Sequence, residues 1–293
     1  MSDFEQVVPL EQLPEGFARR LDDPDRAVPA ARPAATVVLV REGQAGIEVL
    51  LLRRSRTAGF VPGAFVFPGG RVDREDADPR LLRRTDGLSL SRAVRRLRLE
   101  DGDPPATAYF LASVRETFEE TGLLIARGKD GEPAPAPRDD DRILELRRRL
   151  LTGDSTFAEV LETLDLRIDA RSLEYVAHWI TPEAEPRRYD TRFFAAHVPG
   201  NREEVVAPAE ITKAIWISPA DALARNRSGE LPMVFPTLKT LDAFLAFSTP
   251  DELLEHYRSR SIPSILPEFV QTGGGVGLRI PPHPEEGPSG GQA

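Results

Sequence analysis

The alternation of apolar and polar residues predicts a β-hairpin as the first regular structure in the chain. The β-branched run over 35–40 and the apolar run over 47–52 are separated by a glycine-containing turn at 42–46. Two such runs joined by a short loop are typical of paired strands. A further short strand is expected over 65–67, because a Pro-Gly-Gly turn closes the sequence Phe-Val-Phe there.

A helix is predicted from Ala106 to its end at Gly122. Leu111, Val114 and Phe118 recur at spacings of three and four, which puts them on one helix face. Gly122 stands where a left-handed C-terminal cap belongs. We therefore expect a single helix with a defined end.

The remaining sequence predicts short helices and strands, with no regular secondary structure at either end of the chain. Prolines punctuate residues 1–33, so we expect an extended lead-in there. The last thirteen residues hold four prolines and three glycines, and we expect a disordered tail over 268–293. The expected elements are two short helices within 141–164 that break at 152–154, strands over 175–180, 191–198 and 214–217, a helix that begins at Pro219, and helices over 238–247 and 251–257.

Composition and charge narrow the class of protein. The 293 residues suffice for one large or two ordinary domains, and 40% hydrophobic with 29% charged residues is ordinary for a soluble globular chain. The net charge of −9 disfavours nucleic acid as a partner. The chain has no cysteine, which excludes disulfides and thiolate chemistry. We find no signal peptide and no apolar run of membrane-spanning length, and expect a cytoplasmic protein without a membrane partner.

Three carboxylates at the end of the predicted helix are the first candidate chemistry. Each helical residue advances by about 100°, so Glu116, Glu119 and Glu120 fall within an arc of roughly 100°. Carboxylates this close repel one another unless a cation is supplied. Oxygen ligands of this kind suit Mg²⁺. The alternative interpretation is a solvated acidic helix face.

The residues around these carboxylates resemble the Nudix hydrolase box, G-x5-E-x7-R-E-U-x-E-E-x-G-U, where U is apolar. Arg115 stands beside the cluster, Gly122 follows it, and the turn ending at Gly70 precedes it. The match departs from the pattern in three ways. Asp76 replaces the first glutamate, 38 residues rather than 7 separate Asp76 from Arg115, and Thr117 occupies an apolar position.

The resemblance implies an α/β fold, the Nudix α/β/α sandwich with a mixed sheet. It implies a single elaborated domain over 34–267. Within it we expect an insertion in the box at about 77–105, a helical insertion at about 138–170 and added C-terminal helices at about 230–260.

Four flanking stretches are similar to the coenzyme A (CoA) and acyl-CoA diphosphatase branch of that family, in particular its long peroxisomal-type members. These stretches are 51–55, 65–73, 179–182 and 188–194. This resemblance implies cleavage of CoA or acyl-CoA to adenosine 3′,5′-bisphosphate and (acyl)phosphopantetheine. The alternatives are a diphosphatase of ADP-ribose or NADH, and a non-catalytic module that senses a nucleotide.

The resemblance also assigns roles to residues. The metal, Mg²⁺ or Mn²⁺, is expected on Glu116, Glu119 and Glu120 with the backbone carbonyl of Gly70. Candidates for the base that activates water are Glu116 and Glu210, with Glu203 and Glu204 behind the latter; the loop glutamates could equally be ordinary surface residues. Arg115 is expected to hold the carboxylates through a salt bridge.

Other arginines are candidates for contact with a small nucleotide substrate. Arg53, Arg54 and Arg188 could meet phosphate oxygens, or could be merely exposed. The segment 79–98 holds seven arginines and one acid, Asp86. It could form a basic lid over an anionic substrate, or a solvated arginine-rich helix. A homodimer is left open.

Overall fold

The computed structural model describes residues 6–9, 17, 21, 23, 25–57, 61–100, 102–200, 202–207, 210–272 and 275–282. Contacts between residues divide the chain into two compact units. The first comprises 1–32, 178–191 and 263–293, and the second comprises 33–177 and 192–262. The domain boundaries expected from the sequence stay predictions.

The predicted hairpin is confirmed at the centre of the second unit. Strand β2 (Arg32–Gly43) pairs antiparallel with β3 (Gly46–Arg54), and Val40 lies opposite Val49. Residues 37–40 are fully buried, because the sheet is covered on both faces. The sheet continues as β11-β3-β2-β10-β9, with β11 (Ile211–Ile217), β10 (Tyr189–His197) and β9 (Glu174–Ile180) near the predicted bounds. Two short strands extend it: β4 (Phe65–Val66) beside β3, and β5 (Gly69–Arg71) beside β2.

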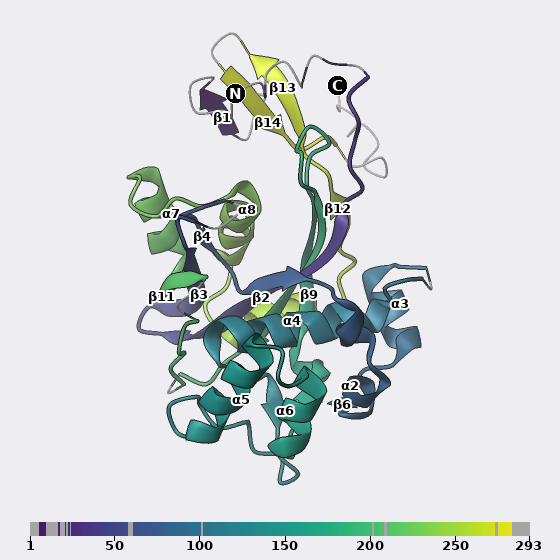
Figure 1. The fold of residues 1–293 in the computed structure, drawn as a ribbon. Coiled ribbons are helices and arrows are strands. Elements are labelled where there is room, and N and C mark those ends of the chain that lie inside the picture. The colour runs from purple at the N-terminus through teal and green to yellow at the C-terminus, as the bar shows by residue number, and fades with distance from the viewer. Residues whose placement is uncertain are drawn as a thin grey trace. The chain divides into compact units, whose positions relative to one another are not determined.

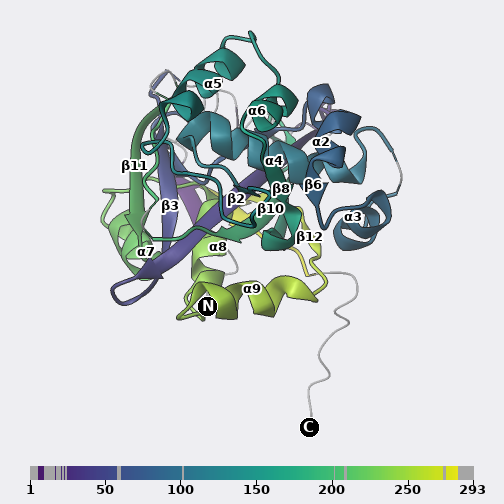
Figure 2. The ribbon, with the colours of Figure 1, turned by 90° about the horizontal axis from the view of Figure 1, so that it is seen from below.

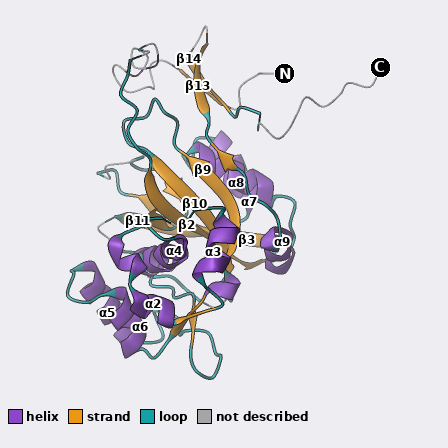
Figure 3. Ribbon diagram, turned by 90° about the vertical axis from the view of Figure 1, so that its right-hand side faces the viewer, coloured by secondary structure: helices purple, strands orange, loops and turns teal. Residues whose placement is uncertain are grey.

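Helices cover both faces of this sheet, as the α/β/α expectation requires. Helix α4 (Ala106–Thr121) lies on one face, and α7 (Pro219–Arg227), α8 (Phe235–Phe244) and α9 (Pro250–Arg258) lie on the other (Figure 3). Pro219 begins its helix as predicted. Helix α8 begins and ends three residues before the predicted range, with Phe235 as its first residue.

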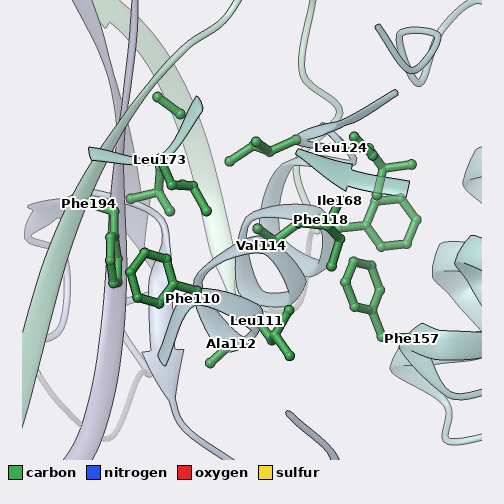
Figure 4. Packing of buried hydrophobic residues seen from close by; sticks show 14 of the residues in the cluster. Phe110, Leu111, Ala112, Val114, Phe118, Leu124, Phe157, Ile168, Leu173 and Phe194 are labelled. Carbon is green, nitrogen blue, oxygen red and sulfur yellow. The ribbon is translucent and has the colours of Figure 1, made fainter. Parts of the chain in front are cut away.

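Helix α4 is the central element of the hydrophobic core (Figure 4). The Phe110 ring packs against Phe194 of β10 at 4.6 Å between centroids, and Phe118 packs against Phe157 at 5.9 Å. Gly122 ends the helix in the left-handed conformation, with φ 75°, and its N–H donates to the Phe118 carbonyl. The predicted helix and its cap are therefore confirmed.

The insertions form a helical layer on α4. The first follows the 3-10 helix η2 (Arg74–Ala77) and contains α2 (Pro79–Arg83), β6 (Thr85–Asp86) and α3 (Leu90–Leu97). The second contains α5 (Asp141–Leu151) and α6 (Phe157–Thr163), which break where predicted and lie beside α4 (Figures 1 and 2). Strand β8 (Arg167–Asp169) pairs with β6 and with β7 (Ala126–Arg127), and the 3-10 helix η3 (Ala170–Ser172) follows it.

The first unit holds a small antiparallel sheet in the order β1-β14-β13. Strand β1 (Gln6–Pro9) lies in the expected extended lead-in. Strands β13 (Glu268–Thr272) and β14 (Gly275–Arg279) lie where we expected a disordered tail, so that prediction is wrong for these residues. In the same unit β12 (Ser264–Ile265) pairs in parallel with the end of β9. Residues 283–293 lie outside the described residues.

Candidate active site

The last turns of α4 bring Glu116 and Glu120 against the two glycines of β5. The Gly69 N–H donates to Glu120 Oε2 at 3.0 Å. A Cβ atom on Gly70 would come within 2.5 Å of the Glu116 carboxylate, so a larger residue there would displace that carboxylate. Because β5 also pairs with β2, the sheet fixes the turn that faces the carboxylates.

Arg115 forms hydrogen bonds with several carboxylates of the cluster. Its Nη1 donates to Glu116 Oε1 at 2.9 Å and to Glu119 Oε1 at 3.1 Å, which is the salt bridge predicted from the sequence. Its Nη2 also donates to the Arg71 carbonyl at 3.0 Å. Burial alone would lower the pKa of Arg115, but hydrogen bonds to Asp76 and the surrounding carboxylates raise it above its ordinary value.

Asp76, which replaces a glutamate of the box, is the main partner of Arg115. It is fully buried and accepts from Arg115 Nε at 2.8 Å and Nη2 at 2.9 Å. Its carboxylate also accepts from the Asp73 N–H at 2.8 Å, which caps η2. The ion pair therefore joins in space the two halves of the box that the insertion separates in sequence.

The cluster has more negative charge than its one guanidinium can balance. Burial raises the pKa of Glu116 to about 7 and that of Glu120 to about 8, and it also raises the pKa of Glu119. Repulsion between Glu116 and Glu120 adds to the shift at Glu120. The raised pKa values show that ionising all of these carboxylates together is unfavourable, and a bound cation would favour their ionised forms.

The donor set fits a hard divalent cation in its chemistry, since every donor is a carboxylate or carbonyl oxygen. Each glutamate already accepts a hydrogen bond, Glu116 and Glu119 from Arg115 and Glu120 from Gly69. Among the described residues, no three acidic or histidine side chains converge into a ready-made metal cage.

The structure brings two further predicted residues toward Glu120. Arg54 lowers the pKa of Glu120 and Glu210 raises it, so both charges lie within electrostatic reach. The Ser55 N–H donates to the Glu210 carbonyl at 2.8 Å, and the Ala207 N–H donates to the Glu120 carbonyl at 3.2 Å. The loop before β11 thus lies along the end of α4, and the Glu210 side chain is exposed.

The other candidates lie in different surroundings. Glu203 pairs with Arg138 at 3.1 Å, and Glu204 accepts from the Trp216 indole N–H at 2.9 Å. The Arg53 guanidinium lies over the Phe65 ring at 5.8 Å. Arg188 belongs to the first unit, where it donates to the carbonyls of Thr181 and Pro29, and the structure does not place it in the carboxylate cluster.

The arginines of 79–98 are not among the strongest electrostatic partners of the three glutamates, and the basic lid stays a prediction. The charges that most perturb the pKa values of the three glutamates come from 54, 73, 76, 115 and 210 and from the glutamates themselves. Arg80 pairs with Glu162, and Arg96 donates to backbone carbonyls. Arg80 thus joins α2 to α6, whereas Arg96 joins α3 to β9 and to the end of α9.

Arg147 of α5 was missed by the sequence reasoning. Its buried guanidinium donates to the Glu119 carbonyl at 2.9 and 2.7 Å and to the Val205 carbonyl. It therefore links the end of α4 to the loop that carries Glu210. Its sequence position could have indicated burial. Arg147 follows Leu146 directly and Ile143 by four residues, which places it on the apolar face of an amphipathic helix.

Comparison with known proteins agrees with this geometry. The family model of the NUDT19 Nudix domain matches residues 30–244. The chain belongs to the Nudix hydrolases. Two relatives are named acyl-coenzyme A diphosphatase NUDT19. The one from Gallus gallus is 28% identical, over 75% of this chain and 67% of its own, and the one from Homo sapiens is 27% identical, over 92% and 77%.

A solved structure supports the fold of this Nudix hydrolase. The crystal structure of the NUDIX hydrolase from Alicyclobacillus acidocaldarius is 32% identical, covers 78% of this chain and 97% of its own, and has a TM-score of 0.65. The expected Nudix fold and the resemblance to the acyl-CoA diphosphatase branch are confirmed. Among the described residues, no helix is long and apolar enough to cross a bilayer.

Proposed function

We propose that this Nudix hydrolase is a metal-dependent diphosphatase of CoA or acyl-CoA. The products would be adenosine 3′,5′-bisphosphate and phosphopantetheine or its acyl form. The observation that carries the proposal is the buried carboxylate cluster at the end of α4, with its excess of negative charge. The names of the relatives supply the substrate class.

In this proposal Mg²⁺ or Mn²⁺ is held by Glu116, Glu119 and Glu120 with the Gly70 carbonyl. When bound, such an ion neutralises charge on the diphosphate and on the leaving oxygen. Asp76 and Arg115 keep the cluster in place, since Arg115 bonds both Glu116 and Glu119. An anionic substrate needs this arrangement, because bare carboxylates would repel its phosphates.

Residues of the chain would carry out proton transfer and bind the substrate phosphates. Glu116 or Glu210 accepts the proton of a water molecule whose oxygen attacks phosphorus. The bond from phosphorus to the bridging oxygen breaks, and the leaving phosphate takes its electron pair. Arg54, close to Glu120, is positioned to donate to a phosphate oxygen of the substrate.

One assay with matched variants tests the substrate and the site together. Purified protein is incubated with Mg²⁺ and either CoA, acyl-CoAs, ADP-ribose, NADH or dinucleoside polyphosphates, and the products are identified. We expect cleavage of CoA or acyl-CoA, a loss of at least about a hundredfold in Glu120→Gln, and no loss in Glu145→Gln, an exposed glutamate of α5.

Three outcomes would contradict the proposal. Inertness across the panel would overturn the enzymatic assignment of the site. Cleavage of ADP-ribose or NADH without cleavage of any CoA would overturn the substrate. Full turnover in Glu120→Gln would overturn the role of the carboxylate cluster.

The two candidate bases can be separated because only one of them is also a proposed metal ligand. If Glu210 is the base, Glu210→Gln lowers kcat by about a hundredfold or more, with KM and Mn²⁺ affinity little changed. An unchanged kcat in Glu210→Gln assigns the base to Glu116 instead.

A further inference from the structure

A second strongly charged site lies in the second unit, between α3 and the residues that follow α9. It is a cavity of about 350 Å³, a volume at the lower end of the range for small-molecule sites. The residues that line it are Arg92, Arg95, Arg96, Arg98, Arg258, Ser259, Arg260 and Ser261. Six arginines and two serines thus line one open site of an acidic protein.

Arg96 fixes the walls of this cavity. It donates to the Arg260 carbonyl and the Tyr257 carbonyl, both at 2.6 Å, and to the Tyr175 carbonyl at 2.9 Å. Its guanidinium also lies over the Tyr175 ring at 5.5 Å. Since these contacts join α3 to the end of α9 and to β9, the other arginines are presented from a rigid frame.

The cations of the cavity are only partly neutralised. Arg258 pairs with Glu174 and Glu255, and Arg92 donates to the Gly87 carbonyl. Arg95 and Arg98 are exposed, and their side chains make no ion pair or hydrogen bond with any residue that the structure describes. Unpaired cations in a concave site attract anions.

A second arginine-rich cavity of the same unit provides a contrast. It is lined by Arg80, Arg83, Arg84, Lys129, Glu162, Asp165 and Arg167. Four of its five cations pair with acids, Arg80 with Glu162, Arg84 and Lys129 with Asp165, and Arg167 with Asp86. In the cavity at α3, Arg96 and Arg258 pair with Glu174, and the other four arginines make no ion pair with a described residue.

The cavity at α3 is separate from the carboxylate cluster. Arg96 lies over Tyr175, whose ring packs against Phe194, which in turn packs against Phe110 near the start of α4. Glu119 follows Phe110 by nine residues, or about 14 Å along the helix axis. The two sites therefore belong to different ends of α4.

We propose that the cavity at α3 binds the phosphate group of a small phosphorylated molecule. The guanidinium fork matches phosphate oxygens in a bidentate way, and the hydroxyls of Ser259 and Ser261 add donors. A nucleic acid would need an extended basic surface, whereas this site measures about 350 Å³ in a chain of net charge −9. This site does not depend on the proposed hydrolysis.

Binding of inorganic phosphate and pyrophosphate tests the proposal. Isothermal titration of the full chain is carried out without divalent metal and at constant ionic strength set with chloride. We expect saturable binding of one anion, at least about tenfold weaker in Arg95→Gln/Arg98→Gln. Arg149→Gln, at an exposed arginine of α5, is the control and should bind like the wild type.

Several results would overturn the site. These are no binding to the wild type, equal binding by the double variant, and equal weakening in Arg149→Gln. Binding confined to a polyanion such as heparin would identify a nonspecific basic surface. Because no turnover is measured, failure here leaves the proposed hydrolysis intact, and failure of that hydrolysis leaves this site intact.

Discussion

Replacement of Asp76 by alanine should destabilise the protein through Arg115. The substitution removes two charge-assisted hydrogen bonds, of 2.8 and 2.9 Å, from a guanidinium whose residue is 5% exposed. Breaking a buried ion pair from one side costs about 3–5 kcal/mol of unfolding free energy. Asp76 also raises the pKa of Glu116 and Glu119, so its removal relieves some repulsion. We therefore expect a loss near the lower end, about 3 kcal/mol.

Urea unfolding measures this loss, provided that the slope with denaturant is unchanged. Asp78→Ala is a matched control in the same segment, because Asp78 caps α2 with one hydrogen bond to the Arg80 N–H. Loss of a helix cap costs about 1 kcal/mol. The turnover of Asp76→Ala should also fall, by about ten- to a hundredfold, because Arg115 then holds Glu116 and Glu119 less firmly.

An Asp76→Ala variant as stable as Asp78→Ala would refute this reasoning. Such a result would mean that Arg115 finds equivalent partners without Asp76. Retained turnover with lost stability would show that the ion pair supports the fold alone.

Three further variants test other parts of the structure. Gly70→Ala places a methyl group within 2.5 Å of the Glu116 carboxylate, and turnover should fall at least about tenfold. Phe118→Ala should lower the unfolding free energy by about 3–5 kcal/mol in urea, because the ring is fully buried. Arg147→Leu releases the end of α4 from the Glu210 loop. We expect it to lower kcat about tenfold, while Arg149→Leu on the exposed face of α5 leaves kcat unchanged; equal kcat values in the two variants would contradict the role of Arg147.

The sequence predicted correctly those elements that depend on residues close together in the chain. The hairpin follows from two apolar runs around a glycine turn, and α4 ends at Gly122 because its left-handed φ favours glycine. The cluster of glutamates follows from helical spacing alone. These features need no knowledge of the rest of the chain.

Features that depend on distant pairing were missed or left open. Strands β13 and β14 lie in a glycine- and proline-rich end of the chain, and β14 also pairs with β1 from the other end. The partner of Asp76 lies 39 residues away, across an insertion, so its role emerged only from the fold. Arg147 is an ordinary helical arginine until the carbonyls of Glu119 and Val205 are placed beside it.

Manganese binding, measured by electron paramagnetic resonance of the full chain, tests whether the end of α4 holds a divalent metal. We expect Mn²⁺ binding that is weakened at least about tenfold in Glu120→Gln and preserved in Glu145→Gln. Equal Mn²⁺ affinity in the wild type and Glu120→Gln would contradict the assignment of a metal site to the end of α4.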